Sequence, residues 1–113
     1  MSAFDFAIKK GDLLPVITAT LKDAAGVAVS LTGATAKFLM KLVGGATLKV
    51  NATATVDPDQ TANKGKVIYT WTGTDTDTAG VYEAEFEITF PGAKKQTFPN
   101  PGYLGVRVDE DLD

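Results

Sequence analysis

A strictly alternating run near the end of the chain constrains the fold more than any other feature. Between Tyr82 and Phe90, apolar or aromatic side chains occupy every second position, with polar side chains between them. A period of two with aromatic and β-branched residues on one face predicts a half-buried β-strand. The glutamates Glu83, Glu85 and Glu87 mark the other face as exposed to solvent. We therefore expect this strand to cover a core on one side only.

A turn precedes this strand and ends in a tyrosine that enters it. Asp77, Gly80 and Tyr82 follow the spacing Asp-x-x-Gly-x-Tyr. This arrangement is typical of the tyrosine corner of immunoglobulin-like sandwiches, in which the phenol bonds to upstream backbone. We predict that the three residues form a structural corner and that the Tyr82 hydroxyl bonds to backbone in the preceding loop.

Other short segments have the same period of two and are separated by turn residues. A helix is conceivable for residues 34–42, which are rich in helix formers, but their alternation favours a strand. The predicted strands cover residues 4–8, 17–21, 27–29, 34–42, 48–56, 66–71, 82–90, 95–98 and 104–108. Seven to nine short strands at such spacing predict an all-β, immunoglobulin-like antiparallel β-sandwich. Trp71 and Phe86 are its expected core anchors.

The 113 residues suit one domain, with a core over about residues 6–108 and an acidic tail at 109–113. The sequence contains neither cysteine nor histidine, which excludes disulfides, Ser-His-Asp sites and the usual zinc sites. The net charge of −3 and the single arginine, Arg107, give nucleic-acid binding little support. No signal peptide and no membrane-spanning segment are expected, because no apolar run is long enough.

One polar loop has the spacing of a calcium site. Asp57, Asp59, Thr61, Asn63 and Gly65 alternate like the first ligands of a calcium loop. The sixth position lacks the required glycine and the twelfth lacks the closing glutamate. An ordinary hairpin loop is therefore the favoured interpretation, and we expect no metal and no cofactor.

Two surface patterns leave functional alternatives open. Tyr69, Trp71 and Tyr103 could form a platform for sugar stacking, which requires exposed aromatic rings. Tyr69 and Trp71 are in phase with a strand, so a place in the core is favoured for both. The row of glutamates on the alternating strand could in principle hold a catalytic pair, but a solvated face is the favoured interpretation.

The N-terminal segment has an apolar face made by Phe4, Phe6 and Ile8 and is separated from the next strand by Gly11-Asp12. Two interpretations are equally supported. The segment is the first strand of the domain's own sheet, or it is an arm that pairs with another chain. Phe4, Phe6 and Ile8 are accordingly the candidates for contact with a partner.

A set of short motifs, taken in order, carries a family resemblance. They are Ile8-Lys-Lys-Gly-Asp12, Pro15, Ala19-Thr-Leu21, Asp23, Gly26, Leu31-Thr-Gly-Ala-Thr35, Phe38-x-Met40, Gly65-Lys-Val-x-Tyr-x-Trp71, Gly80-Val-Tyr-Glu-Ala-Glu-Phe86, Thr97-Phe-Pro-Asn100 and Gly102-Tyr103. Over roughly residues 6 to 108 the chain resembles the immunoglobulin-like N-terminal domain of the baseplate upper proteins of tailed phages. It also resembles small phage structural proteins built on that domain.

The resemblance implies a virion structural protein that is not an enzyme. Such a protein is made in the bacterial host cytoplasm and acts in the tail, baseplate or head–tail region. Its expected partners are other phage structural proteins, and the chain itself is expected to be homo-oligomeric or multi-copy in the particle. No contact with nucleic acid or membrane is expected. A capsid decoration protein is one alternative, and a carbohydrate-binding module for attachment to the host surface is another.

Overall fold

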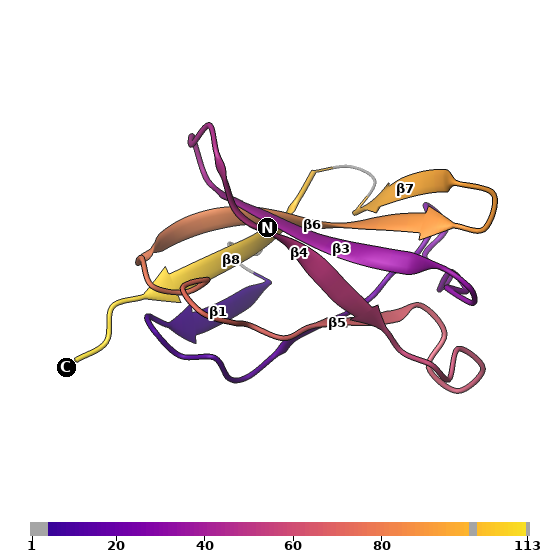
Figure 1. The fold of residues 1–113 in the computed structure, drawn as a ribbon, viewed down its shortest axis with the longest axis horizontal. Coiled ribbons are helices and arrows are strands. Elements are labelled where there is room, and N and C mark those ends of the chain that lie inside the picture. Colours follow the sequence, from indigo (N-terminus) through magenta and orange to yellow (C-terminus); the bar gives the residue numbers. More distant parts are fainter. Residues whose placement is uncertain (1–4, 100–101, 113) are drawn as a thin grey trace.

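Eight β-strands form one nearly closed, barrel-like sheet in the computed structural model, which describes residues 5–99 and 102–112 (Figure 1). The strands are β1 Phe6–Lys9, β2 Ile17–Thr20, β3 Thr35–Leu42, β4 Leu48–Val56, β5 Lys66–Tyr69, β6 Gly80–Phe90, β7 Lys94–Phe98 and β8 Leu104–Asp109. Their order in the sheet is β1-β8-β6-β3-β4-β5-β2, and β7 also pairs with β6. These ranges contain no helix that is long and apolar enough to cross a membrane.

The predicted antiparallel two-sheet sandwich is wrong, although the all-β content and the number of strands agree with the prediction. β4 pairs with β3 along most of its length and then with β5 through Thr55 and Val56. Strand pairing therefore continues from one end of the sheet to the other. β1 and β8 are also parallel, not antiparallel. A period of two shows which side chains turn inward, but it does not show which strands are paired.

β6 organises the sheet because both of its edges are used. β3 pairs with one edge over eight positions. The other edge is divided between β8, which pairs with Gly80 to Ala84, and β7, which pairs with Phe86 to Phe90. The predicted alternation holds along the strand: Tyr82, Ala84, Phe86 and Ile88 are buried, and Phe90 is half-buried against the core. β6 thus covers one side of the core along its length and pairs with three other strands.

A cluster of aromatic rings fills the centre of the core. Phe38 of β3 stacks on Tyr69 of β5 with ring centroids 4.6 Å apart, and it meets Trp71 edge-on at 5.6 Å. Phe86 lies 5.1 Å from Phe38 on the adjacent strand. The Trp71 indole nitrogen donates a hydrogen bond to the Pro15 carbonyl oxygen at 3.1 Å, so its polar atom is satisfied. Trp71 and Phe86, the expected anchors, are 1% and 0% exposed.

Most strand bounds differ from the predicted ones by one or two residues, and two of these differences bear on the core. Residues 27–29 do not form a named strand, and only an isolated bridge joins Lys22 to Ala28 across a tight turn. β5 ends at Tyr69, two residues before the predicted end at Trp71. Trp71 is held instead by ring packing and by its hydrogen bond, which a period of two does not describe. The ambiguous segment 34–42 is a strand over residues 35–42.

Candidate functional site: an outer-face hollow and an open strand edge

The three residues of the proposed aromatic platform do not lie together on the surface. Tyr69 and Trp71 are 3% and 1% exposed, whereas Tyr103 is 57% exposed. The Tyr69 hydroxyl donates a 2.5 Å hydrogen bond to the Asp75 carboxylate, which also accepts from the Thr72 backbone N–H at 2.9 Å. Burial, and then the bond to Asp75, raise the pKa of Tyr69 to about 12. Tyr69 and Trp71 are therefore structural, and only Tyr103 remains available to a ligand.

The predicted corner residues join the loop before β6 to the barrel. The Tyr82 hydroxyl donates the expected hydrogen bond to upstream backbone, reaching the Thr78 carbonyl oxygen at 2.6 Å. Asp77 pairs with Lys49 and accepts a bond from the Thr78 hydroxyl, and these contacts lower the pKa of its carboxyl group. Gly80 is the first residue of β6. The arrangement anchors the loop at the start of the longest strand.

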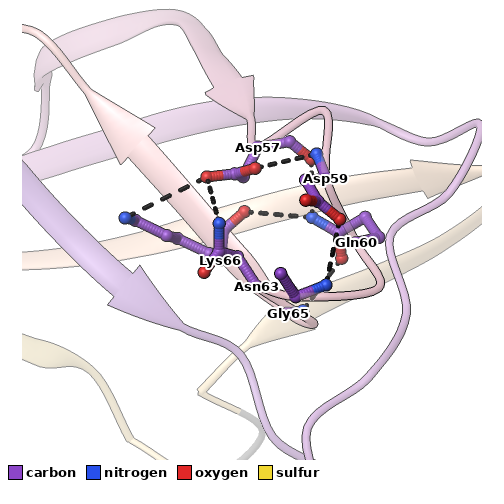
Figure 2. A network of polar contacts seen from close by, with 7 residues as sticks. Asp57, Asp59, Gln60, Asn63, Gly65 and Lys66 are labelled. Carbon is purple, nitrogen blue, oxygen red and sulfur yellow. Dashed lines mark hydrogen bonds and ion pairs between the residues drawn. The ribbon is translucent and has the colours of Figure 1, made fainter.

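The polar loop between β4 and β5 closes around a buried glutamine (Figure 2). The amide oxygen of Gln60 accepts hydrogen bonds from the backbone N–H groups of Leu31, at 3.0 Å, and Gly65, at 2.9 Å. Its amide nitrogen donates to the carbonyl oxygens of Asp57, at 2.8 Å, and Lys66, at 3.4 Å. One side chain therefore satisfies backbone groups from both ends of the loop and from the segment before β3.

The aspartates of this loop are turned toward the loop's own groups. Asp57 accepts from the Asp59 backbone N–H at 2.8 Å, and Asp59 accepts from the Ala62 backbone N–H at 2.9 Å. The second Asp57 oxygen lies 3.3 Å from the Asn63 amide and 4.0 Å from the Lys66 ammonium. Across the described residues, no group of three or more histidine, cysteine or acidic side chains is arranged to hold a metal ion. The regular spacing of these residues serves loop geometry.

The N-terminal segment forms β1, which runs parallel to β8 over four paired positions. Ile8 is buried at 5% exposure, and the Phe6 ring lies 5.8 Å from Trp71. Both side chains therefore contact the core of their own chain, as the first-strand interpretation requires. Phe4 lies outside the described residues. Contact of this segment with a partner stays a prediction.

A shallow hollow lies on the outer face of the sheet, where β3, β4, β6 and the start of β8 meet. Its volume is about 130 Å³, and it is lined by Leu39, Lys41, Leu48, Glu83, Glu85 and Tyr103. Leu39 lies opposite Glu85, and Lys41 opposite Glu83, across the β3–β6 ladder. On the other side Glu83 lies opposite Gly105 of β8, which has no side chain to fill the space. We call this site the outer-face hollow.

The outer-face hollow combines three kinds of side chain. Tyr103 and Leu48 are well exposed, while Glu83 and Glu85 are half-buried. Glu87, the third glutamate of the row, lies 3.9 Å from the Lys95 ammonium and does not line the hollow. The sequence singled out Tyr103 and the glutamates separately. The pairing register brings them together and adds leucines and a lysine that sequence reasoning missed.

A second feature is the open edge of β2. The Leu21 backbone N–H donates to the carbonyl oxygen of Gly65, the residue just before β5, at 2.8 Å, so the backbone groups of Ile17 and Ala19 face β5. Because alternate residues of an antiparallel strand direct their polar groups to opposite edges, those of Thr18 and Thr20 face away from β5. Within the described ranges no strand pairs with that edge.

An apolar groove runs beside this edge, where the end of β2 approaches the end of β7 and the start of β8. Its volume is about 190 Å³, and it is lined by Ala19, Thr20, Leu21, Lys22, Phe98, Pro99 and Leu104. Most of these side chains are apolar, so the groove offers little to a charged ligand and more to an apolar side chain. We call the open edge of β2 together with this groove the seam.

The chain was also compared with known proteins, and neither a family model nor a curated protein matches it.

Proposed function

We propose that this chain is a non-enzymatic structural protein of a tailed-phage particle, an assembly or adaptor module of the tail, baseplate or head–tail region. The observation that carries the proposal is the seam, a strand edge with which no other strand of residues 5–99 and 102–112 pairs, beside an apolar groove. The sequence resemblance supports the assignment to a tailed-phage particle, and the seam supports contact with a partner by strand addition. The partner is another structural protein of the particle that presents an extended segment.

The edge of β2 has the properties that strand addition needs. The N–H and C=O groups of Thr18 and Thr20 lie in a row along it. Unpaired edges are a hazard for soluble proteins, and natural sequences often protect them with proline or charge. The strand Ile17–Thr20 contains neither proline nor a charged residue. An added strand from a partner would turn these exposed groups into backbone hydrogen bonds.

The groove adds selectivity to such a contact. Alternate side chains of an added strand point to the same face, and pockets beside the edge select among them. Of the residues that line the groove, Leu21 and Phe98 are buried and Leu104 is half-buried. An apolar side chain of the partner placed there would remove further apolar surface from water. We therefore expect the partner segment to carry apolar residues at alternate positions.

The place of the chain in the particle is tested by labelling purified particles. An epitope-tagged chain is expressed during infection, particles are purified on a density gradient, and the tag is located by immunogold electron microscopy. We expect label on the tail, the baseplate or the neck. Label spread over the head shell would favour the capsid decoration alternative, and particles without the chain would refute the proposal.

The mode of contact is tested by removing one backbone donor from the open edge. In Thr20→Pro the lost N–H faces away from β5, so the β2–β5 ladder is kept and the melting temperature should stay near that of the wild type. Incorporation into particles should fall sharply. Thr20→Val is the control, because it keeps both the N–H and the β-branched shape. A folded Thr20→Pro protein that enters particles normally would rule out strand addition at the seam.

A further inference from the structure

We propose that the outer-face hollow binds one neutral hexopyranose ring of a polysaccharide. In this complex the ring packs on Tyr103 and its hydroxyl groups bond to Glu83 and Glu85. This function goes beyond the assembly role and uses a different part of the sheet.

The aromatic surface is the first requirement, and Tyr103 provides it. It is the one large aromatic side chain in the well-exposed class among the described residues, at 57% exposure. One face of a pyranose ring presents mainly C–H groups, which pack on an aromatic ring and shield it from water. Leu48, which is 45% exposed, and the half-buried Leu39 extend the apolar surface beside it.

The polar groups of the hollow are placed to bond hydroxyls at the edge of such a ring. Glu83 and Glu85 occupy alternate positions of β6, so their side chains leave the same face of the strand about 7 Å apart. Neither carboxylate makes a hydrogen bond or ion pair with another described residue, so the oxygens keep their capacity to accept. A hydroxyl that donates to a carboxylate forms a charge-assisted bond, which is stronger than a neutral one.

The charge of the hollow selects the class of sugar. Two carboxylates and one ammonium, from Lys41, leave an excess of negative charge around the bound ring. This excess opposes sialic and uronic acids, whose carboxylates would be brought close to Glu83 and Glu85. The Lys41 ammonium can donate to a hydroxyl or ring oxygen, while its aliphatic stem adds to the apolar wall. A neutral hexose meets all of these groups without repulsion.

The size of the hollow sets the expected affinity. A hollow of about 130 Å³ that is open to solvent can contact one ring, and neighbouring rings of a longer chain would extend beyond it. So open a site predicts a dissociation constant of about 1 mM for a single ring, which multivalent display of the sugar would lower.

The test uses the purified full chain. Amide NMR spectra are recorded during titration with methyl glucopyranoside and methyl galactopyranoside, and a glycan array presents neutral, amino and acidic sugars. We expect binding to neutral hexoses, with the largest shifts at Leu39, Glu85, Tyr103 and Gly105. Tyr103→Ala should weaken binding about tenfold or more, whereas Tyr103→Trp should keep it. Val27→Ala is the control, because Val27 is 55% exposed and does not line the hollow.

Three outcomes would overturn the proposal. They are binding to no neutral sugar, shifts centred outside the outer-face hollow, and equal binding by wild type and by a folded Tyr103→Ala. A protein that binds only amino or acidic sugars would also refute the neutral-hexose assignment. Thr20→Pro should bind sugar like the wild type, because the seam is not part of the site. A failure of the assembly proposal can therefore be told apart from a failure of this one.

Discussion

The connections at the two ends of β4 are held by different means. The tight connection before it, residues 43–47, stands out from the body of the sheet in Figure 1. Backbone groups hold it: Gly45 N–H donates to the Leu42 carbonyl oxygen at 2.8 Å, and Val43 N–H donates to Val81 at 2.9 Å. The longer connection after β4, residues 57–65, is held by the side chain of Gln60.

This difference between the two connections shows when a loop needs a specific side chain. A short hairpin in solvent leaves its remaining polar groups to water, so glycine and backbone bonds are sufficient. The longer loop lies against Leu31 and Leu21, which are 0% and 5% exposed. Backbone donors buried there cannot reach water, and each needs a partner inside the protein. Gln60 provides that partner for the Leu31 and Gly65 N–H groups.

Removing the buried amide should have the largest effect. Gln60→Leu has similar volume but leaves the Leu31 and Gly65 N–H groups without an acceptor. We expect a loss of about 4 kcal/mol in the free energy of unfolding, since each unsatisfied buried donor costs about 1–3 kcal/mol. Chemical denaturation measures it. The control Asn63→Ala removes only an exposed 3.3 Å bond and should cost below about 0.5 kcal/mol. Similar losses in the free energy of unfolding for the two variants would mean that the Gln60 hydrogen bonds do not stabilise the loop.

The next largest loss of stability is expected for a substitution at Gly65, in the longer loop. Gly44, in the connection before β4, is its matched control. Gly44 and Gly65 have φ of +80° and +83°. A Cβ on Gly65 would lie 2.7 Å from the Leu21 carbonyl oxygen, whereas one on Gly44 meets nothing within 4 Å. Gly44→Ala should cost about 1 kcal/mol for the left-handed backbone alone. Gly65→Ala should cost about 3 kcal/mol, because a backbone clash is added. Equal midpoints in urea would show that the loop can relax around the added methyl group.

The smallest effect is expected in the tight connection before β4, residues 43–47. Val43 is 51% exposed, and a serine there places its hydroxyl in water. Val43→Ser should change the free energy of unfolding by less than about 0.5 kcal/mol. Thermal melting provides the measurement. A loss above about 1 kcal/mol would mean that the Val43 side chain packs on the rest of the sheet more than its exposure indicates. The connection before β4 would then also depend on a specific side chain, as the longer loop does.

The local structure could largely be read from the sequence. The alternation from Tyr82 to Phe90 gave the correct inner and outer faces of β6, and the same argument selected a strand over a helix for residues 35–42. These predictions hold because the period of two is set by the backbone of each strand alone. The pairing of strands was not predicted. The pairing of β4 with both β3 and β5, which joins the strands into one sheet, depends on the path of the chain in space.

The candidate sites divide in the same way. The exposure of Tyr103 and the outward direction of Glu85 follow from local pattern. Their meeting in one hollow with Leu39 follows from the registers of two ladders, β3–β6 and β6–β8. The seam exists because β2 pairs with β5 on one edge and, in the described part of the chain, with no strand on the other. Nothing in a single sequence marks Gln60 as the side chain that closes the β4–β5 loop, because its partners include Leu31, 29 positions earlier.

By itself, therefore, the sequence determined an all-β chain, the strand that forms the wall of the core, the buried anchors Trp71 and Phe86, and the hydrogen bond of Tyr82. These features depend on the size, polarity and period of neighbouring residues. Only the tertiary structure decided that the strands form one nearly closed sheet, that β1 runs parallel to β8, and that an edge and a hollow remain open. Such features arise from contacts between residues far apart in the chain, and pairing energies there depend on register and packing, which local patterns do not encode.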